Sequence, residues 1–289
     1  MILNKEQYYI FDPTQFKEFG YEFFSQGDFY YRYQLSKKFF LKNIYIPYGP
    51  NCKTKASFEN FLEHINSFRF TTITIDLPMV YDNHAVKDIT QQLVNHGFTK
   101  VPYLHQDEET IIILKNNFKS NSKRMNKVRH GYKFTNIVVK NELNSEEIDQ
   151  IYEIYLLSAT RIGFSPKSKD VFRKLSESCL VSIAYNKLNN KPEGYVFGYI
   201  METNQTITTD SKVKVLLIMF TSLTDDARKH RLGYALHYDL FNTAFKIYHI
   251  DMIDFHGASR KKSRSYVAFK QDWGGKFYSL PGCFKKRLR

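Results

Sequence analysis

The sequence predicts an α/β protein built from two halves of similar element order, residues 1–140 and 141–289. Three observations support this fold class. The chain has 289 residues and is 43% hydrophobic, so it can bury one large core or two smaller ones. Aromatic residues reach 16%, well above the content of a disordered chain. Segments rich in β-branched and aromatic residues alternate with segments of helical periodicity, as in α/β folds.

The first half is predicted to contain a short helix at Asp12-Pro13-Thr14 and then a β-β-α-β-α-β series. The expected strands are Phe29–Leu35, Phe40–Ile46, Thr71–Ile75 and Thr110–Leu114, and the expected helices are Phe58–Phe68 and Val86–Val94. A basic helix, Ser120–His130, follows, and Gly131 is expected to end it as a left-handed cap.

The second half is predicted to run α-α-β-β-β-α-β-α, with a final strand. Its first helix begins at a capping-box pattern, Asn144-Ser145-Glu146-Glu147. Further helices are expected at Lys169–Ser178, Asp225–Tyr248 and Ser263–Gln271, and strands at Leu180–Tyr185, Tyr195–Met201, Val213–Phe220, Met252–Phe255 and Lys276–Ser279. This is the element order of the GNAT fold. The first half looks like a shorter copy, so we expect two GNAT-like halves with mixed sheets around a cleft.

The positive charge is concentrated in two segments. The net charge is +13, and Lys115–Lys140 carries eight Lys/Arg with no acid. His256–Arg289 carries ten Lys/Arg and one acid, Asp272. Concentrated charge favours a polyanionic partner, such as nucleic acid, a nucleotide-linked substrate or an anionic membrane surface. The alternative is a solvated basic surface.

Several classes of protein are disfavoured. The three cysteines, Cys52, Cys179 and Cys283, are far apart and include no CxxC, so neither a disulfide framework nor a zinc site is expected, and no metal is required. No segment has the roughly 20 apolar residues of a transmembrane helix. The N-terminal residues lack the order of a signal peptide, so the expected location is cytoplasmic.

Short motifs occur in a fixed order along the chain. They are Tyr45-Ile46-Pro47-Tyr48-Gly49-Pro50, Thr110–Leu114 with Ser122-Lys123-Arg124 and Lys127, Thr160-Arg161-Ile162-Gly163-Phe164, Asp254-Phe255-His256-Gly257, and Phe269-Lys270-Gln271-Asp272-Trp273-Gly274-Gly275. Together they resemble the FemABX family, whose members move an amino acid from charged tRNA onto an amine of a peptidoglycan precursor. The most specific match is to the family's F-K-x-x-F/W-G-G motif. Tyr48 replaces the usual Arg of its Y-x-P-R-G-P motif.

The resemblance implies an aminoacyltransferase that uses aminoacyl-tRNA as co-substrate and needs no resident cofactor. The acceptor would be an amine of a cell-wall precursor or a similar nucleotide- or lipid-linked compound. The residues implied in substrate binding are Lys37, Lys38, Tyr48, Arg124, Arg161 and Phe269. The basic helix would contact donor phosphates through Lys123 and Lys127, which share one face with Lys119.

Acyl transfer to an amine requires proton removal and stabilisation of an oxyanion. Lys270 is the candidate cation for the oxyanion, because the resemblance places it in the reaction cleft. Asp254 and His256 end the last parallel-type strand and are candidates for the base, and His256 has a suitable ordinary pKa. The alternatives are a surface lysine, a structural carboxylate and a surface imidazole.

A second donor remains open. In GNAT enzymes that use acetyl-CoA, a glycine-containing helix start binds the pyrophosphate. Here Arg228, Arg231, Gly233 and Ala235 occupy such a start, although His230 stands where Arg or Gln is usual. An acyl-CoA-dependent N-acyltransferase acting on an amino sugar or amino acid is therefore the alternative function. A non-catalytic RNA-binding protein is the third, and it leaves the F-K-x-x-W-G-G motif without a use.

Overall fold

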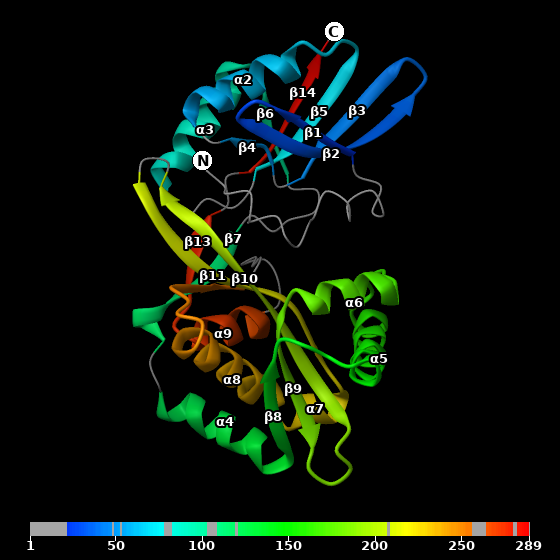
Figure 1. The fold of residues 1–289 in the computed structure, drawn as a ribbon, viewed down its shortest axis with the longest axis vertical. Coiled ribbons are helices and arrows are strands. Elements are labelled where there is room, and N and C mark those ends of the chain that lie inside the picture. The colour runs from blue at the N-terminus through cyan, green and yellow to red at the C-terminus, as the bar shows by residue number, and fades with distance from the viewer. Residues whose placement is uncertain are drawn as a thin grey trace.

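The computed structural model contains two mixed seven-stranded sheets with helices packed on each (Figure 1). It describes residues 22–47, 49–52, 54–77, 83–102, 109–118, 121–206, 209–255, 264–279 and 282–288. The short helix expected at Asp12-Pro13-Thr14 lies outside these ranges.

The first sheet has the order β1-β2-β3-β5-β14-β6, and β4 pairs with β2. Its strands are β1 (Glu22–Gln26), β2 (Phe29–Lys38), β3 (Leu41–Ile46), β4 (Asn51–Cys52), β5 (Thr71–Asp76), β6 (Thr99–Val101) and β14 (Cys283–Leu288). Among its described strands, β3 and β5 are parallel and the other pairs are antiparallel. Helices α2 (Lys55–Asn66) and α3 (Asn83–Asn95) join the core of this sheet through Phe61, Leu62 and Leu93, none of which is exposed.

The second sheet has the order β13-β7-β12-β11-β10-β9-β8. Its strands are β7 (Glu109–Leu114), β8 (Thr135–Lys140), β9 (Leu180–Asn186), β10 (Pro192–Thr206), β11 (Thr209–Leu223), β12 (Met252–Asp254) and β13 (Lys276–Ser279). In the part of the chain that the structure describes, β11 and β12 are parallel and the other pairs of this sheet are antiparallel.

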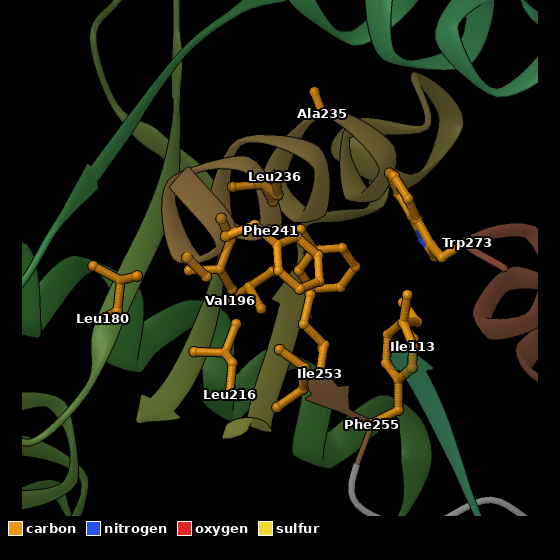
Figure 2. Packing of buried hydrophobic residues seen from close by; sticks show 14 of the residues in the cluster. Ile113, Leu180, Val196, Leu216, Ala235, Leu236, Phe241, Ile253, Phe255 and Trp273 are labelled. Carbon is orange, nitrogen blue, oxygen red and sulfur yellow. The ribbon is translucent and has the colours of Figure 1, made fainter. Parts of the chain in front are cut away.

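Helices cover both faces of the second sheet. The helices are α4 (Ser122–Phe134), α5 (Ser145–Ile162), α6 (Lys169–Glu177), α7 (Asp225–Lys229), α8 (Leu232–Lys246) and α9 (Arg264–Asp272). Adjacent strand residues point to opposite faces, so Leu216 joins the core under α8 while Leu217 joins the core under α5 and α6. Figure 2 shows the first of these cores, where Phe241 of α8 packs over Leu216 and Ile253 of the strands.

The two sheets do not divide the chain at residues 140 and 141, the boundary predicted from the sequence. The chain enters the second sheet with β7 and stays there through β13, and β14 then returns to the first sheet between β5 and β6. The basic helix α4 and strand β8 therefore belong to the second sheet. The physical reason is strand pairing, since β14 completes the ladders of both β5 and β6.

Two local predictions are wrong. Gly131 lies inside α4 rather than capping it, and a Cβ there would come within 2.9 Å of the Ala235 Cβ, so this glycine allows α4 and α8 to cross closely. The helix expected over Asp225–Tyr248 is two helices, because Arg231 adopts a left-handed conformation with φ of 58°. Strands β1, β4, β6, β8 and β14 were not predicted.

Candidate active site

The second sheet opens at the carboxyl ends of its parallel strands. Strands β11 and β12 pair over three residues, up to Leu217 and Asp254. Beyond Leu217, β11 continues to Leu223 and pairs only with β10 among the described residues. A β-bulge lies in that stretch, because Gly198 pairs with Ile218 and Phe197 with Phe220. Ligands of open α/β sheets bind at such strand ends.

Lys270 is buried at the end of β12. It belongs to α9 and is only 2% exposed. Its Nζ donates to the carbonyl oxygen of Phe255 at 3.1 Å and lies 4.1 Å from the ring centroid of Tyr266. The alternative of a surface lysine is therefore wrong. A positive charge fixed beside the strand opening is suited to stabilising a developing oxyanion.

Asp254 ends β12 one residue before that carbonyl, and its side chain is fully buried. Its Oδ1 accepts a hydrogen bond from the Thr110 hydroxyl at 2.5 Å. The structure thus brings Lys270 and Asp254 to one strand end. His256 lies outside the described residues.

The first sheet repeats this arrangement. Tyr45, near the end of β3, donates from its hydroxyl to Asp76 Oδ2 at 2.5 Å, and Asp76 ends the parallel strand β5. Asp76 is fully buried, and its Oδ1 has no hydrogen-bond partner within the described residues. Asp76 was not predicted as a site residue, although an Asp directly after an apolar strand is a recognisable signal. Each sheet therefore ends one parallel strand in a buried Asp that accepts from a hydroxyl.

The strand end at Asp76 lies close to the second sheet. Cys283 pairs with Asp76, whereas Ser279 pairs with Glu109 in the other sheet. Four residues of chain span at most about 14 Å. Asp76 and Asp254 therefore both lie at strand ends that face the chain segment joining the two sheets. The cleft predicted there stays a prediction.

Arg124 and Lys127 are engaged in packing rather than exposed on a basic face. Arg124 is 3% exposed, stacks 4.9 Å from the Trp273 ring and donates to the Asp272 carbonyl at 2.6 Å. Lys127 forms an ion pair with the Asp272 carboxylate at 2.7 Å and donates to the Tyr234 hydroxyl. Both residues hold α4 against the end of α9, so Lys127 is paired within the protein and only Lys123 of the two predicted donor contacts is exposed. Lys123 is exposed, and Lys119 lies outside the described residues.

Phe269 packs beside a buried histidine. Its half-buried ring lies 4.9 Å from Tyr234 and 5.0 Å from His237 between ring centroids. His237 Nδ1 lies 2.7 Å from the Gly233 carbonyl oxygen, so this nitrogen carries the proton and donates. Burial lowers the pKa of His237 to about 4, and the nearby Lys270 charge adds to the effect. No sequence pattern predicted this neutral imidazole.

The remaining predicted residues lie in three places. Lys37 is exposed on β2, and the Lys38 side chain and all of Tyr48 lie outside the described residues. Arg161 donates to the Leu223 carbonyl at 3.3 Å, at the end of β11. Around the start of α8, Arg228 and Arg231 are exposed, whereas Gly233 and Ala235 are buried.

Among the described residues, the second basic segment is divided between the two sheets. Lys285 and Arg287 lie on β14 in the first sheet, whereas α4 packs on the second, and Figure 1 shows β14 and α4 at opposite ends of the molecule. Lys286 is also engaged, since its Nζ donates to Asn66 Oδ1 at 2.8 Å. The described basic residues of the two segments are therefore divided between the halves.

The cysteines are free thiols and buried. Burial raises the pKa of Cys52 and Cys179 to about 12, so neither is a thiolate nucleophile at neutral pH. Within the described ranges, no cluster of His, Cys, Asp and Glu could hold a metal ion, and no helix there is long and apolar enough to cross a bilayer.

Solved structures match almost the whole chain. FemX matches with a TM-score of 0.72 at 15% identity, over 99% of this chain and 92% of its own. This fold resembles that of FemX. The C-terminal domain of a putative lysylphosphatidylglycerol synthetase from Agrobacterium fabrum has a TM-score of 0.64 at 9% identity, over 93% of this chain and 84% of its own. A tandem GNAT protein from the clavulanic acid pathway has a TM-score of 0.53 at 11% identity, over 93% and 83%.

These likenesses confirm the predicted fold of two GNAT-like halves with mixed sheets, and with it the structural resemblance to FemABX proteins. No protein-family model matches the sequence, and no curated protein matches it either.

The glycines of the F-K-x-x-W-G-G motif have a structural role that can be tested. Gly274 has φ of 86°, and a Cβ there would lie 2.6 Å from the Asn117 carbonyl oxygen. Gly274→Ala is expected to lower the free energy of unfolding by about 2 kcal/mol, measured by urea denaturation. Gly163→Ala is the matched control, because Gly163 has φ of 83° with nothing within 4 Å of its Cβ. It should cost about 1 kcal/mol; equal losses would show that the contact with Asn117 is unimportant.

Proposed function

We propose that this protein is an N-acyltransferase that moves an amino acid from aminoacyl-tRNA to an amine of a cell-wall precursor or a similar nucleotide- or lipid-linked acceptor. The observation that carries the proposal is the buried Lys270 ammonium, held by the Phe255 carbonyl where β11 and β12 separate. The names of two structural neighbours, FemX and lysylphosphatidylglycerol synthetase, agree with a donor and acceptors of this kind.

In the proposed reaction, the acceptor amine attacks the ester carbonyl of the aminoacyl-tRNA. A C–N bond forms, the ester C–O bond breaks, and the proton lost by the amine ends on the released ribose hydroxyl. The Lys270 charge offsets the oxyanion of the tetrahedral intermediate. Asp254 lies at the same strand end, and its hydrogen bond from Thr110 suits it better to holding the site than to accepting a proton. Asp76 is placed to bind a cationic amine, because one of its oxygens is buried and unpaired within the described residues.

An acyl-CoA donor is the second candidate, because of the start of α8. The N-cap of this helix, Arg231, makes no side-chain capping hydrogen bond, and α8 runs for 15 residues from there. Helix starts attract phosphate groups. A Cβ at Gly233 would make only ordinary contact, 3.4 Å from Leu223 Cδ1, so protein packing does not require this glycine.

Donor choice is expected to favour aminoacyl-tRNA. Labelled aminoacyl-tRNA should bind with an affinity that falls steeply with salt, while acetyl-CoA shows no saturable binding. The variant Arg231→Glu reverses the charge at the start of α8, and Lys246→Glu makes the same change at the exposed far end of that helix. If acetyl-CoA binds in the micromolar range, and Arg231→Glu abolishes this binding while Lys246→Glu does not, the acyl-CoA function replaces the proposed one.

A further inference from the structure

Three exposed phenylalanines lie at the strand ends of the first sheet that are remote from Asp76, which we call the remote edge. Phe39 and Phe40 form the two-residue turn between β2 and β3 and are 90% and 77% exposed. Phe70, directly before β5, is 56% exposed. The Lys42 N–H donates to the Phe70 carbonyl oxygen at 3.0 Å, which joins the two loops. A group of large apolar side chains in water marks an interaction site.

Two of these phenylalanines also have an unfavourable backbone conformation. Phe39 has φ of 57° and Phe70 has φ of 52°, a region that favours Gly and Asn. Packing in the core does not offset the free energy of this conformation, because both side chains are mostly in solvent. The compensation is therefore expected from a partner outside the chain.

The surroundings of the rings are basic. Lys37, Lys42 and Arg69 are exposed beside them, and Arg287 on β14 pairs with Thr72 at the start of β5. The sequence has no acidic residue over 29–46, 66–75 or 283–288, which contain the strands β2, β3 and β14, the turns at this edge and β5 up to Ile75; Glu59 and Glu63 of the neighbouring helix α2 are exposed. The partner should therefore carry negative charge as well as an apolar layer.

We propose that this edge of the first sheet docks on an anionic lipid bilayer, with Phe39, Phe40 and Phe70 among the head groups and acyl chains. A bilayer fits better than a protein groove, because the rings project from a turn and are flanked by cations, the combination that binds anionic membrane surfaces. Figure 1 shows the β2–β3 turn and the C-terminal end of β14 at the end of the molecule that points away from the second sheet.

Docking in this way leaves the opposite strand ends, where Asp76 lies, accessible from water. Strands β3 and β5 have six residues each, so Asp76 stands about 20 Å from the remote edge. The inference goes beyond the proposed function and does not depend on it, because membrane binding can be measured without any acyl transfer.

Vesicle co-sedimentation tests the docking. The wild type should bind vesicles containing phosphatidylglycerol, bind phosphatidylcholine vesicles much more weakly, and dissociate as salt is raised. The variant Phe39→Asn/Phe40→Ser keeps a residue that tolerates the left-handed turn, and it should bind at least about tenfold more weakly. Lys37→Glu/Lys42→Glu should also weaken binding more than about tenfold, since each basic residue near the surface contributes roughly fivefold.

A second exposed turn supplies the control. Leu188 is 97% exposed in the β9–β10 turn, and Lys191 nearby is exposed too. Leu188→Ser/Lys191→Glu should bind vesicles like the wild type. Equal binding by the wild type and Phe39→Asn/Phe40→Ser would overturn the proposal, and so would equal binding to neutral and anionic vesicles.

Fluorescence gives an independent measure of ring depth. The only tryptophan of the chain, Trp273, is fully buried in the second half, so brominated lipids should not quench its emission. Phe40→Trp should add an emission that brominated phosphatidylglycerol quenches. If this emission is not quenched, the membrane proposal fails. It also fails if the wild type sediments as a dimer that Phe39→Asn/Phe40→Ser disperses, because the partner is then a second copy of the chain.

Discussion

Lys270→Met is expected to lower the turnover of acyl transfer by on the order of 100- to 1000-fold, while donor affinity changes little. The lysine is buried, and its Nζ is held 3.1 Å from the Phe255 carbonyl oxygen, so the charge is in position before the substrates arrive. A charge that is needed mainly when the oxyanion forms affects kcat more than ground-state binding. Single-turnover transfer from labelled donor, with separate donor titrations, measures both quantities.

Two further variants distinguish catalysis from packing. Lys270→Arg should restore little activity, because a planar guanidinium does not replace a compact ammonium packed between Phe255 and Tyr266. Lys127→Met is the matched control, since it removes an ion pair of the same helix end without reaching the strand opening. It should lower stability and leave kcat nearly unchanged. Near-normal kcat in folded Lys270→Met would make Lys270 a structural residue.

The free energy of unfolding is expected to fall by about 3 kcal/mol between pH 6.5 and pH 4 through His237 alone. Burial holds the pKa of this imidazole near 4 in the folded state, against 6.5 for an ordinary histidine. Below pH 6.5 the imidazole of His237 binds a proton in the unfolded chain but stays neutral in the folded chain until the pH nears 4. The stabilisation is therefore complete above pH 6.5 and is lost progressively as the pH falls to 4.

Urea unfolding across this pH window measures the effect. Acid also removes stabilisation that comes from carboxylates. Burial by itself would raise the pKa of Glu147, but hydrogen bonds from Lys140 and Tyr185 lower it, so the stabilisation from Glu147 is lost when this group is protonated. The comparison with His237→Gln isolates the histidine, because the variant keeps these carboxylates. Its stability should be less dependent on pH by about 3 kcal/mol over the window. Parallel pH profiles for the two proteins would exclude the buried imidazole as the cause.

Local features of the fold were predictable from the sequence, because their causes lie within a few residues. The box at Asn144 and Glu147 caps α5 with both of its reciprocal hydrogen bonds. Asn190, in the turn between β9 and β10, adopts the left-handed conformation that Asn tolerates.

Other features depend on contacts between distant parts of the chain. The return of β14 to the first sheet depends on ladders with β5 and β6, which are about 200 residues away. Charge and spacing alone made Lys127 look like an exposed cation, but Asp272 comes beside it only when α9 packs against α4.

The sequence by itself determined most of the helices, many of the strands and the capping box of α5. Each of these is set by periodicity or by side chains three or four residues apart, which interact before the chain has folded. The tertiary structure decided that Asp76 is a buried carboxylate, that His237 is a neutral imidazole and that Arg124 is a packing residue. Burial is a property of what surrounds a group, and those neighbours come from elements far along the chain.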